Sequence, residues 1–111
     1  MNSAVVFDRA QALERLGGDE ELLATVAGLF VEERVNYRQA LVDALASGDP
    51  AMLRREAHTV KSVFATFSFE AGRELAARLE RQAAGGNLAG AGELTAEVIA
   101  AIETLAAALD A

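Results

Sequence analysis

Hydrophobic residues recur along most of the chain at the three- and four-residue spacing of an amphipathic helix, and short glycine-containing breaks separate the stretches that carry this spacing. No stretch shows the alternation of β-branched and polar residues that marks a half-buried strand. Alanine, leucine, glutamate and arginine dominate the composition, and proline occurs once. Because these common residues favour helices, the pattern predicts an all-α protein.

Capping residues and glycines divide this pattern into five predicted helices. Asp, Ser and Asn start helices well because their side chains accept hydrogen bonds from free backbone N–H groups. The expected caps are Asp8, Asp19, Asp49 (followed by Pro50), Ser68 and Asn87. The expected breaks are Gly17–Gly18, Ser47–Gly48 and Gly85–Gly86. Four substantial helices after a short N-terminal one, joined by loops of a few residues, predict an antiparallel up-and-down four-helix bundle built as a single domain over residues 1–111.

The third predicted helix carries the only histidine, His58, and three residues later the only lysine, Lys61. On a helical wheel these two residues lie roughly 130° from the apolar stripe, so both are expected to be exposed. Neutral imidazole is a nucleophile near pH 7, and an adjacent cation disfavours its protonation while attracting a phosphoryl group. The pair therefore suits phosphoryl capture, although no acidic residue lies three or four positions from His58 to orient its ring.

Composition excludes several other kinds of site. The chain has no cysteine and one histidine, so thiol catalysis is excluded and no metal site is expected. Its net charge of −7 argues against nucleic-acid binding. No signal peptide and no apolar run of roughly 20 residues is present, which predicts a cytoplasmic protein without a membrane segment. The glycine-rich stretch GGNLAGAG lacks the Lys-Ser/Thr of a P-loop, so no ATP site is expected.

The residues around His58 resemble the signature of the histidine-containing phosphotransfer (HPt) domains of bacterial and plant phosphorelays. That signature is approximately A-H-x-hydrophobic-K-G, followed by apolar residues and a Gly-led helix ending in L-x-x-x-L-E. The matching residues here are Ala57-His58-Thr59-Val60-Lys61-Ser62, Phe64, Phe67, Gly72, Leu75, Leu79 and Glu80. Upstream, FDRAQALERLGGDEELLATVAGLF and ASGDPAMLRREAH also resemble the family. Two departures are Ser62 and Ser68, which stand where the family usually has glycine.

The resemblance implies a phosphorelay carrier. His58 would accept a phosphoryl group on Nε2 from an aspartyl-phosphate receiver domain, for example that of a hybrid histidine kinase, and pass it to a response-regulator aspartate. Lys61 would stabilise charge on the phosphoryl oxygens. The chain would act as a monomer without a cofactor or kinase activity of its own, and Mg²⁺ would be bound by the partner receiver domain.

Because a receiver presents an acidic pocket ringed by apolar residues, the expected docking surface is basic and partly apolar. Its predicted residues are Arg54, Arg55, Ser62, Ala65 and, from the long second helix, Arg38, with Arg34 or Tyr37 as alternatives. Two other functions stay open. One is an HPt-like adaptor that binds a kinase or receiver without transfer, and the other is a structural bundle that oligomerises through the Ala-rich last helix.

Overall fold

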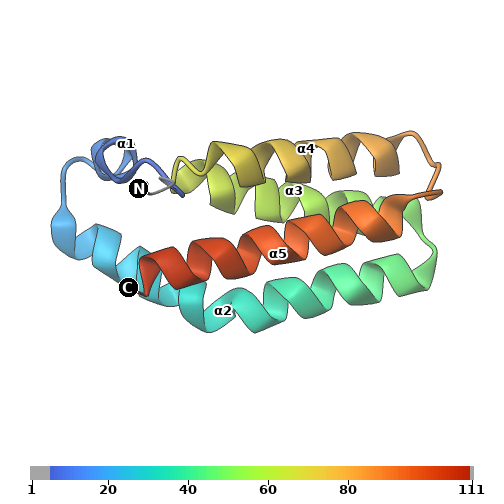
Figure 1. Ribbon diagram of the computed structural model, residues 1–111, viewed down its shortest axis with the longest axis horizontal. Helices are drawn as coiled ribbons and strands as arrows, with labels where there is room; N and C mark the ends of the chain where they lie inside the picture. Colours follow the sequence, from blue (N-terminus) through green and yellow to red (C-terminus); the bar gives the residue numbers. More distant parts are fainter. Residues whose placement is uncertain (1–5, 111) are drawn as a thin grey trace, which may run out of the picture.

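The computed structural model describes residues 6–110, and this part of the chain consists of helices, turns and short connections without any strand. The helices are α1 (Arg9–Arg15), α2 (Glu20–Ser47), α3 (Pro50–Thr66), α4 (Glu70–Ala84) and α5 (Ala91–Leu109). The four long helices lie alongside one another in an elongated body of 40 × 28 × 20 Å (Figure 1). This confirms the prediction of an all-α protein with a short first helix.

Three of the predicted caps start helices as expected. The side chain of Asp8 accepts a hydrogen bond from the backbone N–H of Gln11 at 2.9 Å. Asp19 and Asp49 do the same for the first turns of α2 and α3, at 3.0 Å each. Each cap satisfies one of the backbone donors that a helix leaves free at its start.

The other two predicted caps are wrong. The residue that precedes α4 is Phe69, which makes no side-chain cap, and Ser68 adopts a left-handed backbone conformation with φ of 53°. Asn87 accepts a hydrogen bond from the backbone of Ala89 within the loop, and α5 begins only after Gly90. Both side chains therefore stabilise the connections between helices rather than the helix starts.

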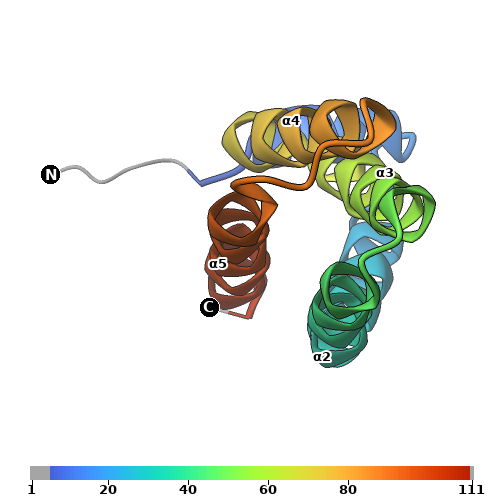
Figure 2. The ribbon, with the colours of Figure 1, turned by 90° about the vertical axis from the view of Figure 1, so that its right-hand side faces the viewer.

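The core lies between the four long helices. Viewed along the helices, α3 lies between α2 and α4, and it packs most extensively against α4 (Figure 2). The largest fully buried side chains include Leu41, Leu53, Phe64, Phe67, Leu79, Ile102 and Leu105. Burial of this apolar surface is the main force that holds α3 and its exposed residues in a fixed orientation.

Helix α1 is attached to the turn between α3 and α4. The backbone N–H of Asp8 donates to the carbonyl of Ser68 at 3.2 Å, and the guanidinium of Arg15 donates to the hydroxyl of Ser68 at 3.0 Å. The ring of Phe7 packs edge-on against Phe67, with centroids 6.4 Å apart. These contacts fix one end of α3, two turns beyond His58.

Gly72 allows α4 to pack closely beside this turn. A Cβ atom at Gly72 would lie 2.5 Å from the ring of Phe69 and 2.9 Å from the ring of Phe64. These two rings form an edge-to-face pair with centroids 5.0 Å apart. The glycine therefore makes room for an aromatic contact that sets how α4 lies against α3.

Among the described residues, no helix is both long enough and apolar enough to cross a membrane.

Candidate functional site

His58 and Lys61 project from the face of α3 that lies away from the core. The His58 side chain is 60% exposed, and that of Lys61 is 29% exposed. The opposite face of α3 buries Leu53, Ala57, Val60 and Phe64. The helical periodicity therefore predicted the side of α3 on which the imidazole lies. The lower exposure of Lys61 reflects a contact between its side chain and a neighbouring helix.

That neighbouring helix is α4, which contributes Glu80. One carboxylate oxygen, Oε2, lies 2.8 Å from Nδ1 of His58, and the other, Oε1, lies 2.6 Å from Nζ of Lys61. The Glu80 side chain is only 18% exposed, so the two interactions are partly shielded from water. A single carboxylate thus holds both the imidazole and the ammonium.

The hydrogen bond from His58 to Glu80 selects one tautomer of the ring. An ionised carboxylate can only accept hydrogen bonds, so Nδ1 must carry the proton that it donates to Oε2. In the neutral ring the lone pair is then on Nε2. The free lone pair of His58 is therefore on Nε2, the ring nitrogen that does not contact Glu80.

The environment of Glu80 keeps this carboxylate ionised at neutral pH. The hydrogen bond from Lys61 is the largest influence and lowers the pKa of Glu80 below its ordinary value of 4.5. Partial burial opposes this shift by raising the pKa, whereas the hydrogen bond from His58 lowers it further. Glu80 is thus available as an acceptor wherever His58 is neutral.

Glu80 stands at the end of the L-x-x-x-L-E pattern, but the sequence did not indicate its contact with His58. The positions one turn away from His58 on its own helix hold no acid, and spacing along a single helix reveals nothing further. Glu80 comes from the next helix, which packs alongside α3. The residue could have been found by asking which acid of the following helix lies level with His58.

The four α3 residues predicted to contact a partner lie within two turns of His58. Arg54 and Arg55 are exposed, one turn before His58. Ser62 and Ala65, one and two turns after it, line a shallow depression between α3 and α1 that is completed by Arg15, Leu16 and Thr66. The end of α1 is thus part of the surface next to His58, which the sequence did not indicate.

Arg38, the predicted docking residue of α2, lies away from His58. Its guanidinium donates to Glu103 of α5 at 2.6 Å, and Arg34 lies 3.5 Å from the same carboxylate. Both arginines therefore face α5, whereas His58 lies where α3 meets α4. The structure does not bring Arg38 or Arg34 together with His58, because the side of α2 that carries them is turned away from α3.

A groove between α2 and α3 has a volume of about 220 Å³ and is mainly apolar. We refer to it as the α2–α3 groove, and its lining residues are Val26, Leu29, Phe30, Glu33, Tyr37, Val63, Thr66 and Phe67. Tyr37 is half-buried and stacks on Phe30 with centroids 5.9 Å apart, as expected for a residue at the core edge. Leu29 remains 55% exposed. Thr66 lines both this groove and the depression next to Ser62, so the two are neighbours on the surface.

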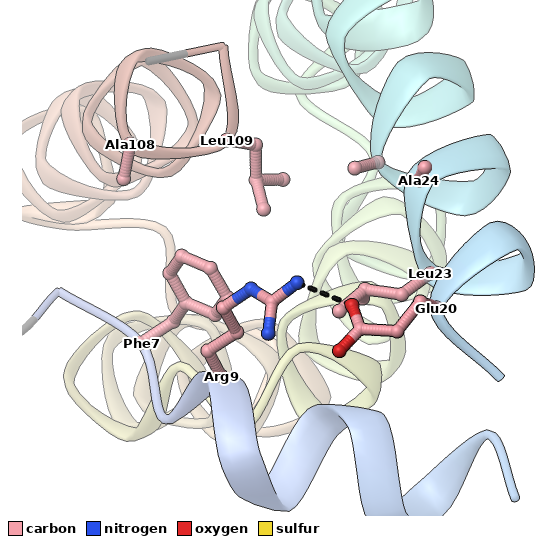
Figure 3. A pocket seen from close by; sticks show the side chains of 8 residues that line it. Phe7, Arg9, Glu20, Leu23, Ala24, Ala108 and Leu109 are labelled. Atoms are coloured by element: carbon pink, nitrogen blue, oxygen red, sulfur yellow. Dashed lines mark hydrogen bonds and ion pairs between the residues drawn. The ribbon is translucent and has the colours of Figure 1, made fainter. Parts of the chain in front are cut away.

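A larger pocket of about 410 Å³ lies at the end of the molecule where α1, the start of α2 and the end of α5 meet (Figure 3). Arg9 and Glu20 form an ion pair of 2.5 Å beside it, and the rest of its lining is apolar. Neither His58 nor Lys61 is among the residues that line this pocket.

Comparison with known proteins identifies one family. The family model described as Hpt domain matches residues 25–111, which is more than half of the chain and includes His58, Lys61 and Glu80. None of the curated proteins compared with the chain matches it, and neither does any of the solved structures.

Proposed function

The chain belongs to the Hpt domain family, whose members take part in two-component phosphorelays with receiver domains, and on this premise we propose that His58 carries a phosphoryl group between two receivers. The donor would be the aspartyl phosphate of one receiver, such as that of a hybrid histidine kinase. The acceptor would be the aspartate of a response regulator. The observation that supports this proposal most directly is the exposed imidazole whose Nδ1 is held by Glu80.

In the proposed transfer, the lone pair on Nε2 attacks the phosphorus of the aspartyl phosphate. The bond between phosphorus and the aspartyl oxygen breaks, and the aspartate leaves as a carboxylate. Nδ1 keeps its proton, so the phosphorylated ring is positively charged and Glu80 stabilises it through the existing hydrogen bond. The aspartate of the second receiver then attacks phosphorus, and the neutral imidazole is regenerated.

The surroundings of His58 fit a receiver as the partner. Arg54 and Arg55 add positive charge next to the imidazole, while Ser62 and Ala65 form part of a hollowed, partly apolar surface. Such a surface complements an acidic pocket with an apolar rim. Lys61 would help to neutralise the phosphoryl oxygens, and Mg²⁺ would be supplied by the receiver's carboxylates.

We also propose how the helices are arranged and that the chain acts as a single copy. Helices α2 to α5 would form an antiparallel up-and-down four-helix bundle, in which short loops connect consecutive helices. The chain would act as a monomer, and one copy would supply His58, Lys61 and Glu80 together. Neither a bound cofactor nor ATP would be needed for the transfer.

Replacement of the only histidine provides the decisive test. Wild-type protein and the His58→Gln variant are incubated with a phosphorylated receiver, and transfer of label is measured. We expect acid-labile label on the wild-type protein and none on the variant. Helical content and thermal stability should be nearly unchanged, because His58 is exposed. Label retained on the variant would show that His58 is not the acceptor. A wild-type protein that binds receivers without taking up label would instead be an adaptor.

A further inference from the structure

Lys61 forms an ion pair with Glu80 and is less exposed than the imidazole beside it. Its Nζ lies 2.6 Å from Oε1 of Glu80, and its side chain is half as exposed as that of His58, at 29% against 60%. From this geometry, and on the basis of the proposed function, we infer that Lys61 is a positioning residue that neutralises Glu80, and that this is its main contribution to transfer.

The need for such a residue follows from the two effects that a carboxylate has on a neighbouring imidazole. As a hydrogen-bond acceptor, Glu80 orients the ring and leaves the lone pair on Nε2. As an anion, it also favours the protonated ring, which has no lone pair on either nitrogen and cannot attack phosphorus. A cation on the other carboxylate oxygen reduces the second effect and leaves the first intact.

The remaining charges around His58 do not replace Lys61 in this role. On α3, Arg54 and Arg55 are exposed one turn before the histidine. On α4, Arg81 follows Glu80 and is exposed as well. On α2, the titratable groups toward α3 are Glu33 and Tyr37, which line the α2–α3 groove. Within the described residues, Lys61 is the basic side chain that forms an ion pair with Glu80.

If Lys61 acts through Glu80, its effect on the titration of His58 depends on the charge of Glu80. We compare the wild-type protein with Lys61→Met, Glu80→Gln and the double variant, because methionine keeps the apolar stem and glutamine keeps a hydrogen-bond acceptor. Lys61→Arg restores the cation and serves as the conservative control. His58 is the only histidine, so its titration can be followed by NMR without assignment of other imidazoles.

We expect Lys61→Met to move the midpoint of the His58 titration to higher pH, because the Glu80 carboxylate is no longer neutralised. In the Glu80→Gln background the same substitution should cause less than half of this shift. Lys61→Arg should titrate close to the wild-type protein. Equal shifts in the two backgrounds would show that Lys61 acts on His58 without Glu80, and the inference would be wrong.

Phosphorylation by phosphoramidate, a small phosphoryl donor that needs no receiver, gives a second measurement. We expect Lys61→Met to react about threefold more slowly at pH values below the wild-type titration midpoint and to approach the wild-type rate at high pH, where the ring is neutral in both proteins. A loss of reaction rate that is equal at every pH and also occurs in the Glu80→Gln background would show that Lys61 acts directly on the phosphoryl group. The inference would then be wrong. A wild-type protein that receivers fail to label would refute the proposed function, whereas the NMR titration would still test the role of Lys61.

Discussion

Glu80 accepts a hydrogen bond from Nδ1 of His58 at 2.8 Å across the contact between α3 and α4. The same carboxylate binds Lys61, so the surroundings of both side chains of α3 include a residue of another helix. Under the proposed function, the relative placement of α3 and α4 would therefore matter for transfer as well as for stability.

Glu80 should contribute to stability in a pH-dependent manner. Its pKa is lowered in the folded protein, chiefly by the hydrogen bond from Lys61, so its contribution is present above the ordinary value of 4.5 and is lost as the pH falls through the folded pKa. We expect Glu80→Gln to lower the free energy of unfolding by about 1 kcal/mol at pH 7. The difference from the wild-type protein should shrink as the pH falls below 4.5, because the carboxylate becomes protonated.

Urea denaturation followed by circular dichroism at several pH values measures this difference. Glu97→Gln, on an exposed position of α5, is a matched control and should change stability little at any pH. A difference for Glu80→Gln that stays constant from pH 7 down to the lowest pH at which the protein is folded would contradict the proposed ionic role of Glu80.

Ser68 should be less favourable than glycine at its position, despite its hydrogen bond. Its φ of 53° lies in the left-handed region, where a residue with a Cβ atom is destabilised by roughly 1 kcal/mol. Ser68→Ala keeps this strain and removes the hydrogen bond from Arg15, whereas Ser68→Gly removes both. We expect the glycine variant to be more stable than the alanine variant by about 1 kcal/mol in thermal or urea unfolding. The opposite order would show that the backbone at Ser68 is not strained.

The sequence predicted those helix starts that depend on local interactions. Asp8, Asp19 and Asp49 each bond to a backbone N–H two or three residues away, so the cap is encoded within one turn. The backbone at Ser68 is instead fixed by the reversal of the chain between α3 and α4 and by α1, which bonds to it. Propensity alone therefore assigned a cap where the tertiary structure requires a left-handed residue.

In the candidate site, too, the sequence predicted the features that depend on one helix and not those that depend on helix packing. The exposure of His58 depends only on the apolar stripe of its own helix, and the sequence contains that stripe. The role of Glu80 and the direction of Arg38 depend on which helices are neighbours and which faces meet. The spacing of residues along a single helix does not specify which helices are neighbours or which of their faces meet.

Substitution by alanine should destabilise the protein at Gly72 and stabilise it at Gly28. The Cβ atom of Gly72→Ala would lie 2.5 Å from the Phe69 ring, so the packed rings must shift, and we expect a loss of about 1–3 kcal/mol. A Cβ atom at Gly28, within α2, would meet no neighbouring group within 4 Å, so alanine should stabilise the helix there by about 0.5–1 kcal/mol. Urea unfolding of the two variants tests both signs. Stabilisation by Gly72→Ala would contradict the close packing between α3 and α4.

Arg55 and Arg38 allow the docking surface to be tested with the same chemical change at two places. Arg55 is exposed on α3 near His58, so Arg55→Gln should slow association with an acidic receiver about threefold at low salt, and less at high salt. Arg38 is paired with Glu103 on α5, so Arg38→Gln should leave transfer unchanged and cost about 0–1 kcal/mol of stability. Transfer rates measured over a range of receiver and salt concentrations separate the two variants. If Arg38→Gln slows transfer as much as Arg55→Gln does, the receiver must also contact the α2–α5 side of the molecule, and the surface around His58 is not sufficient for docking.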